Sequence, residues 1–336
     1  MTTPVPPALA FRALRLLSDG EFRSGEALAR TLGVSRTTVW KALQGLERLG
    51  ITLFRVHGRG YRLVTPVDWL DPARVGPHLG PQRGTFQLHV VDAVDSTNTV
   101  LLAEGLAGAP SGLTLAAEVQ TGGRGRRGRT WHSGLGGALT FSVLWRFEQG
   151  VGNLGGLSLA VSVALVRALR ELGGGEVQLK WPNDLIWQHH KLAGVLTELE
   201  GDVMGPSAAV IGIGVNVRLE AAVRERVDQA VTDLAAAGVA QDRNRVLGTL
   251  LRHLADVLAL FSRAGFAPLR EEWMRYDALA GKAVAVTMPD RSEHAGIVAG
   301  VADDGALQLQ TAMGLRHFHS GELSVRPLEG GLRRAG

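Results

Sequence analysis

Residues 120–131 read Gln-Thr-Gly-Gly-Arg-Gly-Arg-Arg-Gly-Arg-Thr-Trp, and this stretch says more about the fold than any other. Gly123, Gly125 and Gly128 match the G-x-G-x-x-G pattern of a dinucleotide-binding turn. That turn opens a helix and binds pyrophosphate through backbone amides, whereas here Trp131 and more glycines follow, and four arginines lie among the glycines. A Walker phosphate loop is excluded because Gly-Lys-Ser/Thr is absent. The stretch therefore predicts an anion-binding loop outside both of these nucleotide folds.

The composition of this loop also predicts its behaviour. Its arginines, Arg124, Arg126, Arg127 and Arg129, repel one another, and glycines lose more backbone entropy than other residues when they become ordered. Ordering about ten such residues costs on the order of 10 kcal/mol. We therefore expect a mobile loop that becomes ordered around an anionic ligand, because arginine–phosphate contacts offset this cost. A second nucleic-acid contact is the alternative interpretation.

The hydrophobic pattern on both sides of the loop predicts a mixed α/β domain. The expected strands are 86–91, 113–119, 138–147, 178–180, 192–200 and 208–217, and the expected helices are 97–106, 154–172, 243–264 and 269–280. The helix at 154–172 is apolar around most of its surface, so it should pack against the sheet. Further short strands are expected at 283–288, 294–301, 306–310, 315–319 and 323–326, and their spacing predicts a small SH3-like β-barrel.

The excess positive charge belongs to the N-terminal segment. Residues 1–64 contain ten Lys and Arg against four Asp and Glu, a net charge of +6, whereas the whole chain carries +4. The rest of the chain is therefore slightly acidic, and a polyanionic partner is expected for the N-terminal segment alone. Arginine supplies nearly all basic residues, since the chain has only four lysines: Lys41, Lys180, Lys191 and Lys282.

The same segment has the pattern of a winged helix. Apolar spacing predicts three helices and then two short strands, at 8–17, 25–32, 36–49, 51–56 and 61–64. Ser24 and Ser35 can cap the second and third helices. The third helix would enter a DNA major groove and the hairpin wing would meet phosphates, with contacts from Ser35, Arg36, Thr37, Thr38, Trp40, Lys41, Arg55 and Arg59. A winged helix that binds only protein is the alternative.

We expect four parts in the chain: the winged helix-turn-helix at 1–64, a proline-bearing linker at 65–73, the central α/β domain at 74–280 and the barrel at 281–330, with a frayed tail at 330–336.

No apolar run approaches the ~18 residues of a membrane helix and no signal-peptide pattern opens the chain, so a cytoplasmic protein without a membrane partner is expected. The absence of cysteine excludes disulfides, thiolate zinc sites and thiol nucleophiles.

Four further motifs supply groups that can bind a ligand. Residues 180–184, Lys-Trp-Pro-Asn-Asp, and 191–194, Lys-Leu-Ala-Gly, hold two of the four lysines, which indicates a need for a compact ammonium group. Asp184 suits Mg²⁺ or a ribose. Residues 211–216, Ile-Gly-Ile-Gly-Val-Asn, let a ligand approach a strand, although such glycines also mark simple bulges. Asp-Ser-Thr-Asn at 95–98 either caps a helix or binds a small polar ligand.

Together these motifs resemble the biotin protein ligase family, in the bifunctional form that also represses the biotin operon. The similarity covers nearly the whole chain, and the strings GRGRRG, KWPND and KLAG in this order are highly specific. The resemblance implies a multidomain α+β enzyme that uses ATP and Mg²⁺ to make biotinyl-5'-AMP from biotin. It also implies transfer of biotin to a lysine of the biotin carboxyl carrier protein of acetyl-CoA carboxylase. The adenylate would act as corepressor, promoting a homodimer that binds operator DNA with two winged helices.

The resemblance also assigns roles by position. Lys191, Arg124 and Arg126 would be catalytic, with Lys191 between the biotin carboxylate and the α-phosphate, and Asp184 is the expected Mg²⁺ ligand. The implied biotin contacts are Ser96, Thr97, Asn98, Gln120, Gly123, Arg124, Gly125, Arg126, Lys191 and Gly194. The implied ATP and adenylate contacts are Arg126, Arg129, Trp131, Lys180, Asn183, Asp184, Lys191, Gly214 and Asn216.

The chain departs from the family pattern after Asn216. Some members place an aromatic residue there to cover adenine, but residues 218–260 contain none. Aliphatic side chains around 223–231 would then have to cover the base. The histidines at 189–190, 317 and 319 match no family role and should lie on the surface.

Two alternative functions stay open at this point. A lipoate or octanoate ligase shares the acyl-adenylating architecture, but the winged helix and the GRGRRG loop argue against it. A non-enzymatic, ligand-sensing DNA-binding regulator would need only the winged helix and a pocket, and the full set of catalytic residues argues against that. Acid-dependent exchange of pyrophosphate with ATP separates these functions.

The expected ordering of the arginine loop can be tested by limited digestion with trypsin. Because a bound anionic ligand should order the loop, biotin with ATP is expected to protect the bonds after the arginines at 124–129. Mass spectrometry of the fragments measures the protection. Equal cleavage with and without the ligands would contradict the prediction.

Overall fold

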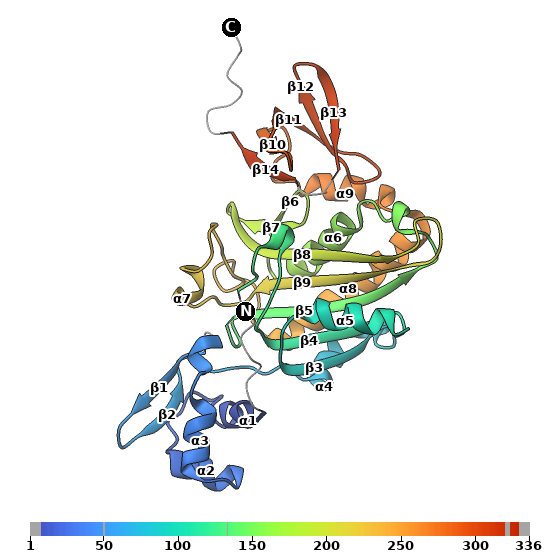
Figure 1. Cartoon of the computed structure of the whole chain (residues 1–336). Coiled ribbons are helices and arrows are strands. Elements are labelled where there is room, and N and C mark those ends of the chain that lie inside the picture. Colours follow the sequence, from blue (N-terminus) through green and yellow to red (C-terminus); the bar gives the residue numbers. More distant parts are fainter. Residues whose placement is uncertain (1–7, 50, 133, 320–322, 329–336) are drawn as a thin grey trace.

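The computed structural model describes residues 8–49, 51–132, 134–319 and 323–328 of the chain. The N-terminal helices and their wing lie at one end of the molecule, the C-terminal strands lie at the other, and a broad sheet with its helices lies between them (Figure 1). None of the described helices is long and apolar enough to cross a membrane. The predicted tail at 330–336 lies outside the described residues.

The N-terminal part has the predicted winged-helix order. Its elements are α1 (Ala8–Leu16), α2 (Gly25–Leu32), α3 (Arg36–Leu43), the 3-10 helix η1 (Leu46–Leu49) and the antiparallel strands β1 (Leu53–Val56) and β2 (Gly60–Leu63). Both serine caps are confirmed, since Ser24 and Ser35 accept backbone hydrogen bonds at 3.0 and 3.1 Å. The third helix is shorter than predicted because Gln44 is extended and Gly45 has a φ of +84°, so only a 3-10 turn follows.

The central domain is built on a seven-stranded mixed sheet. In spatial order its strands are β3 (Gln87–Val94), β4 (Leu113–Gln120), β5 (Ala138–Phe147), β9 (Ser207–Asn216), β8 (His190–Gly201), β7 (Asp184–Trp187) and β6 (Gln178–Lys180). β3 and β4 are parallel, and the other neighbouring pairs are antiparallel. All six predicted strands are present. β7 is not predicted, because its apolar run is too short to indicate a strand.

Helices cover both faces of this sheet. α5 (Thr97–Leu106) packs on one face, and α6 (Leu157–Glu171) and α8 (Arg243–Ala264) pack on the other (Figure 1). α5 and α8 have the predicted bounds, and α6 is buried against the sheet as predicted. α6 begins later than predicted because Gly156 adopts a φ of +78°.

The last predicted helix, at 269–280, is confirmed in its first half and wrong in its second. Only α9 (Arg270–Arg275) forms, because the backbone then turns and bonds on both sides of Leu179 in β6, through the Tyr276 carbonyl and the Ala278 N–H. Hydrophobic periodicity does not predict this strand-like pairing, because the two segments are far apart in the sequence. Short elements complete the domain: α4 (Pro72–Val75), η2 (Gly76–Gln82), η3 (Arg126–Gly128), η4 (Val151–Asn153), α7 (Ala221–Arg224) and η5 (Ala267–Leu269).

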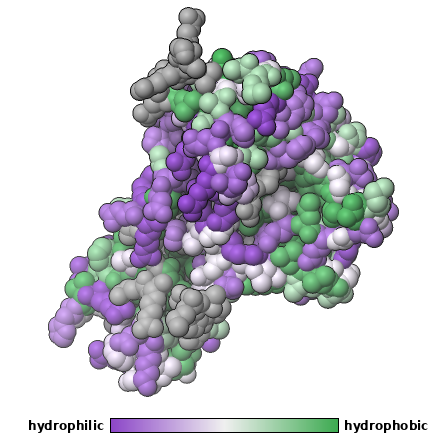
Figure 2. All heavy atoms as spheres, turned by 45° about the horizontal axis from the view of Figure 1, so that its top comes forward, coloured by the Kyte–Doolittle hydropathy of each residue, from purple (hydrophilic) through white to green (hydrophobic). Residues whose placement is uncertain are grey.

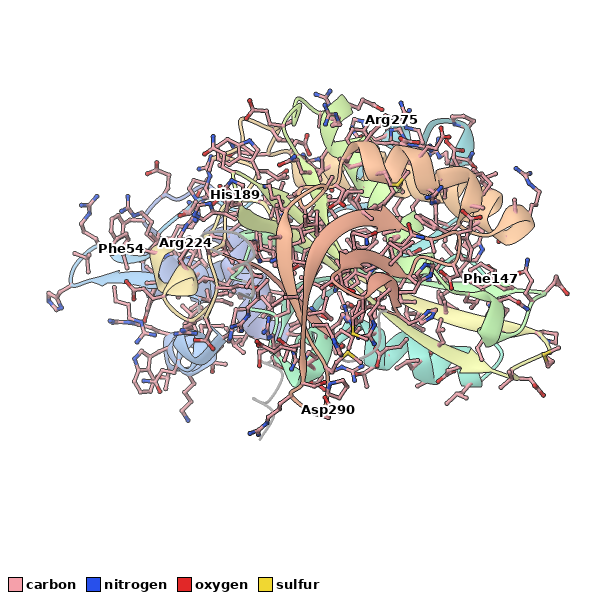
Figure 3. The ribbon with its side chains drawn as sticks, turned by 90° about the horizontal axis from the view of Figure 1, so that it is seen from above. Phe54, Phe147, His189, Arg224, Arg275 and Asp290 are labelled. Atoms are coloured by element: carbon pink, nitrogen blue, oxygen red, sulfur yellow. The ribbon has the colours of Figure 1, made fainter. Side chains whose placement is uncertain are left out.

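The C-terminal part contains the five predicted strands. They are β10 (Ala283–Thr287), β11 (Glu293–Val301), β12 (Leu307–Thr311), β13 (Gly314–Phe318) and β14 (Ser324–Pro327). They form one antiparallel sheet in the order β13-β12-β11-β10-β14, strongly curved in Figure 3. Among the described residues the two edge strands do not pair with each other.

The winged helix packs on the central domain through a shared core. Phe11 of α1, Val67 of the linker and Val119 of β4 belong to one buried cluster. Arg15 of α1 also pairs with Asp92 of β3 at 2.5 Å. The basic module is therefore held against the sheet at the β3–β4 side.

A buried ion pair holds the linker. Arg243 Nη1 on α8 lies 2.7 Å from Glu118 Oε2 on β4, and both side chains are at most 2% exposed. The other Glu118 oxygen accepts the Leu70 N–H at 2.7 Å, while the same Arg243 nitrogen donates to the Asp68 carbonyl at 3.0 Å. The linker backbone is thus bound between a helix and a strand of the central domain.

Removing one partner of this pair should destabilise the protein strongly. Arg243→Met leaves the Glu118 charge buried without its cation, and a loss of about 3–5 kcal/mol of unfolding free energy is expected. Urea titration measures the loss. Glu26→Gln serves as the control, because Glu26 and its partner Arg30 are 79% and 78% exposed, and no measurable change is expected there. An unchanged urea midpoint for Arg243→Met would count against the assigned role of the pair.

Candidate functional site

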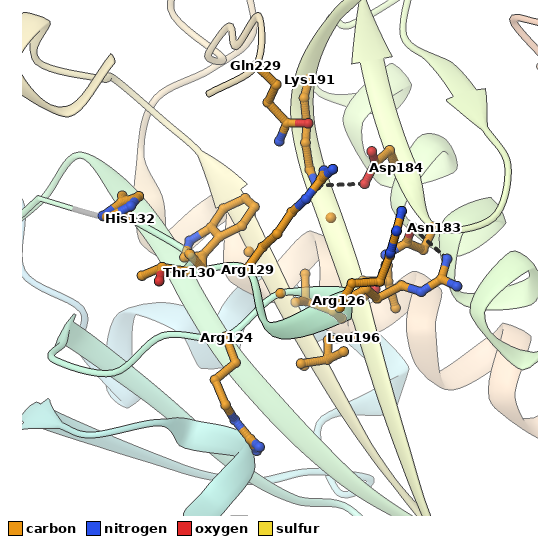
Figure 4. A pocket seen from close by; sticks show the side chains of 18 of the residues that line it. Arg124, Arg126, Arg129, Thr130, His132, Asn183, Asp184, Lys191, Leu196 and Gln229 are labelled. Atoms are coloured by element: carbon orange, nitrogen blue, oxygen red, sulfur yellow. Dashed lines mark hydrogen bonds and ion pairs between the residues drawn. The ribbon is translucent and has the colours of Figure 1, made fainter. Parts of the chain in front are cut away.

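A cavity of about 760 Å³ opens where the arginine loop, the β6–β7 turn and the glycine-bearing parts of β8 and β9 meet. Figure 4 shows the charged side chains that converge on it. Most of the predicted ligand contacts line it: Ser96, Thr97, Asn98, Gln120, Arg124, Gly125, Arg126, Arg129, Trp131, Lys180, Asn183, Asp184, Lys191, Gly194 and Gly214. Residues that are over 100 positions apart in the chain are therefore brought together as predicted.

Two predicted contacts, Gly123 and Asn216, are not among the lining residues. The Gly123 carbonyl accepts the Trp131 N–H at 2.9 Å, so this glycine shapes the base of the loop. Asn216 is buried and donates to the carbonyls of Thr232 at 3.0 Å and Lys191 at 3.4 Å. Asn216 thus ties the segment after α7 to the start of β8.

Sequence reasoning missed several lining residues. Arg226, Asp228 and Gln229 border the cavity from the segment after α7, and Arg326 of β14 borders it from the C-terminal sheet. Gln229 lies close to Lys191 in Figure 4. No motif marks these residues, because only the tertiary fold brings them to the cavity. Val227 also lines the cavity, and it lies in the segment 223–231 whose aliphatic side chains were expected to cover the adenine.

A chain of hydrogen bonds organises the end of the cavity at α5. Gln120 Oε1 accepts from the Thr97 backbone N–H at 2.8 Å and from its hydroxyl at 3.1 Å. Thr97 and Ser142 share a hydrogen bond of 2.6 Å, and Ser142 donates to Asn98 Oδ1 at 2.5 Å. Ser96 caps α5, as one of the two interpretations of this motif required. These buried polar groups form a rigid wall suited to a small polar ligand.

The arginine loop is a closed turn in this structure. Gly125 N–H donates to the Arg129 carbonyl at 2.7 Å, and Arg124 and Thr130 form a bridge across the loop. Arg127 at the tip has a φ of +59°. Arg126 donates to Asn183 Oδ1 at 3.4 Å, and burial lowers the pKa of its guanidinium, although nearby Asp184 opposes this.

Lys191 is fixed by an ion pair with Asp184. The Nζ–Oδ1 distance is 2.7 Å, and the two side chains are 18% and 20% exposed. β7 and β8 set this geometry, since Asp184 is directly opposite Gly194 in their register. The Trp131 ring centroid lies 5.7 Å from the same ammonium nitrogen. The ammonium group is thereby held at the centre of the cavity.

Glycines allow these side chains to lie on the sheet. A Cβ at Gly214 would come within 2.4 Å of the Trp131 ring, and a Cβ at Gly194 would lie 3.0 Å from the Lys191 side chain. The glycines after residue 211 are therefore required by close packing rather than by a bulge. The glycines of the motif at 211–216, which the sequence alone left open between two interpretations, are thus explained by the side chains packed on them.

Positive charge accumulates around the same spot. Burial lowers the pKa of Lys180, and the nearby cations Lys191, Arg129 and Arg326 lower it further, while Asp184 raises it. In Figure 2, hydrophilic side chains crowd the middle of the molecule, between the winged helix and the C-terminal sheet. Such a concentration of cations is stabilised by an anionic ligand.

Two aspartates line the cavity, Asp184 and Asp228, and Asp184 lies at its cationic centre, beside Lys191. The described residues contain no cluster of three or more His, Cys, Asp or Glu that could hold a metal by themselves. Mg²⁺ commonly binds through one or two carboxylates together with substrate phosphates, so a single Asp184 fits that requirement. A nucleotide would have to supply the other ligands.

The predicted DNA-binding surface is accessible. Arg36, Thr37, Trp40 and Lys41 are exposed on α3, and Ser35, Thr38, Arg55 and Arg59 are exposed beside them. The wing extends away from the central sheet, with Phe54 near its end (Figure 3). Phe22 supports the wing, since the Arg59 guanidinium stacks on its ring at 4.2 Å. The histidines at 189, 190, 317 and 319 are exposed, as predicted.

Comparison with known proteins gives three consecutive family matches. Residues 10–62 match an HTH domain, residues 90–216 match the biotin/lipoate A/B protein ligase family, and residues 280–326 match the biotin protein ligase C-terminal domain. The three matched segments follow the order of the three folded parts described above.

Individual relatives agree with these matches. The bifunctional ligase/repressor BirA of Escherichia coli is 38% identical over 318 residues, which cover 95% of this chain and 97% of that protein. The biotin–[acetyl-CoA-carboxylase] ligase of Mycobacterium tuberculosis is 35% identical over 237 residues, covering 69% and 86%. The Aquifex aeolicus biotin protein ligase in complex with biotin and ATP superposes with a TM-score of 0.60 at 30% identity, covering 72% of this chain and 99% of that one.

Proposed function

The chain belongs to the biotin protein ligase family, in its bifunctional ligase/repressor form, and from that premise we propose how its residues divide the work. The cavity makes biotinyl-5'-AMP from biotin and ATP. The activated biotin then passes to a lysine of the biotin carboxyl carrier protein of acetyl-CoA carboxylase. We keep 1–64, 65–73, 74–280 and 281–330 as the boundaries of the winged helix, linker, biotin- and ATP-binding catalytic domain and C-terminal barrel.

The Lys191–Asp184 pair is the observation that carries this proposal. Attack of the biotin carboxylate on the α-phosphorus of ATP brings two anions together, and the bond to pyrophosphate breaks as the new phosphorus–oxygen bond forms. Lys191, between the carboxylate and the α-phosphate, neutralises both during this step. Arg124 and Arg126 add positive charge from the loop. Mg²⁺ bound at Asp184 would neutralise phosphate charge.

Biotin is proposed to bind at the α5 end of the cavity. The rigid wall of amide and hydroxyl groups suits its ureido ring, which both donates and accepts hydrogen bonds. The proposed contacts are Ser96, Thr97, Asn98, Gln120, Gly123, Arg124, Gly125, Arg126, Lys191 and Gly194.

The nucleotide is proposed to bind toward β6, β7 and the segment after α7. Lys180, Asn183 and Arg129 would hold the phosphates, and Trp131, Gly214 and Asn216 would shape the side of the adenylate. Val227 lines the cavity on that side, so aliphatic packing together with Trp131 replaces the aromatic that is absent after Asn216.

The transfer step needs no protein nucleophile. The amine of the carrier lysine attacks the carbonyl carbon of the mixed anhydride, AMP leaves with the electrons of the broken carbon–oxygen bond, and an amide forms. This agrees with the absence of cysteine from the chain.

We further propose that the adenylate is the corepressor and that it promotes a homodimer on operator DNA. β3 is an edge strand of the described sheet, so its backbone groups are available for pairing with a second copy. Two winged helices in one dimer would read two half-sites. We propose the cytoplasm as the compartment, where carrier protein and operator DNA are both accessible.

Removal of the Lys191 ammonium group should slow adenylation. Lys191→Ala is expected to lower the rate of biotin-dependent exchange of pyrophosphate with ATP by about 10²-fold or more, because a preorganised cation at the reacting atoms is lost. A near-normal rate in this variant would refute the role of Lys191. Lys282→Ala is the matched control, since Lys282 is exposed outside the cavity, and it should exchange at the wild-type rate.

The same exchange assay distinguishes the acid substrate. Biotin is expected to activate exchange, and lipoate or octanoate is not, because the polar wall at α5 would leave its hydrogen-bonding groups unpaired against an aliphatic chain. Exchange activated by lipoate alone would make the chain a lipoate ligase. DNA binding that responds to biotin without any exchange would make it a non-enzymatic regulator.

A further inference from the structure

Glu198 on β8 contacts two residues of the cavity without lining the cavity itself. Its Oε2 accepts from Asn98 Nδ2 at 2.7 Å and from Arg124 Nη2 at 2.9 Å. The Glu198 side chain is 26% exposed, whereas that of Arg124 is 44% exposed. One carboxylate oxygen therefore joins the buried α5 end of the cavity to the arginine loop.

The Asn98 side of this junction is rigid. Asn98 is 3% exposed, and its Oδ1 accepts from the Ser142 hydroxyl at 2.5 Å. A Cβ at Gly212 would come within 2.2 Å of the same oxygen, so the amide is packed directly on β9. Asn98 can therefore turn only its nitrogen toward Glu198, which fixes the position of the carboxylate.

The Arg124 side belongs to the loop that carries four like charges. Closing this loop brings its guanidinium groups together, and nearby carboxylates offset their repulsion. Arg126 has Asp184 nearby at one end of the loop, and Arg124 has Glu198 at the other. Glu198 is thus the anion on the sheet that favours the closed position of the Arg124 end.

We propose that Glu198 is a positioning residue that latches the arginine loop, through Arg124, over the biotin end of the cavity and so retains biotinyl-5'-AMP until a carrier lysine arrives. The inference rests on the proposed function of the cavity. Glu198 lies seven positions from Lys191 along β8 and contacts none of Lys180, Asn183 and Arg129, the residues proposed to hold the phosphates, and its replacement leaves the charge of Arg124 available for the chemical step. Its loss therefore affects release of the intermediate more than the chemical step.

The test compares retention of the adenylate in Glu198→Gln and wild type. Adenylate is formed from labelled biotin and ATP, free ligand is removed by gel filtration, and release is followed after addition of unlabelled biotin. Glu198→Gln keeps an acceptor for Asn98 but loses the charge, so release about fivefold faster is expected, the upper range for a partly exposed ion pair. The maximal rate of pyrophosphate exchange should stay within about twofold of wild type.

Glu200→Gln is the matched control. Glu200 is two residues further along the same strand, and its carboxylate lies beside Gly105 at the end of α5, away from the loop. Release in this variant should equal that of wild type. If Glu198→Gln and Glu200→Gln release the adenylate at the same rate, the latch is refuted.

A double variant shows whether the effect passes through Arg124. In an Arg124→Gln background, Glu198→Gln should change release no further, because the ion pair is already lost. A further fivefold change in the double variant would overturn the proposal, since it would mean that Glu198 acts elsewhere. Failure of wild type itself to form the adenylate is a different result, and it would overturn the proposed function of the cavity.

Discussion

The buried pair between Glu118 and Arg243 is the contact on which the arrangement of the domains depends. It fixes the linker between β4 and α8, and the two residues that follow Glu118 in β4 extend the same constraint. Val119 packs in the core of the winged helix, and Gln120 bonds to Thr97 at the cavity. Three consecutive residues of one strand thus contact the linker, the DNA-binding module and the ligand site. The winged helix cannot shift relative to the central domain without disturbing β4.

The cavity shows how a site for two anionic substrates is kept folded before they bind. Lys180, Lys191 and the loop arginines repel one another, and the fold compensates with Asp184 and Glu198 at fixed positions on the sheet. Burial and like charges lower the pKa of Lys180, which means that the charged form of this side chain is less stable here than in water. An anion that binds here reduces the repulsion between these cations, so their arrangement favours phosphate binding.

Much of the fold could be predicted from the sequence, because local signals were strong. The serine caps, the bounds of α5 and α8 and the strands with clear hydrophobic runs follow from spacing alone. The predictions that were wrong or incomplete depended on contacts between distant segments. The end of α9 is set by pairing with Leu179. α3 ends early at Leu43, because Gln44 is extended and Gly45 is left-handed despite the apolar spacing that continues.

The site divides in the same way. Motifs with unusual composition, such as the arginine loop and the lysine-bearing strings, could be found by reading the chain. Arg326, Gln229 and Glu198 could not, because each is an ordinary charged or polar residue until the fold places it beside the cavity. Asn216 stands out in the sequence, yet its role in tying Lys191 to Thr232 is visible only in three dimensions.

The scarcity of lysine has a consequence for an enzyme that makes a reactive acyl donor. A mixed anhydride acylates neutral amines, whereas guanidinium groups stay protonated and inert. Of the four lysines, Lys180 and Lys191 are half-buried in the cavity, and Lys41 and Lys282 are exposed. Because most of the basic side chains are arginines, adenylate that leaves the cavity meets few lysine amines on this chain with which it could react. Lys41 on α3 is one of the exposed exceptions, and acylation there would remove a charge from the surface proposed to bind DNA.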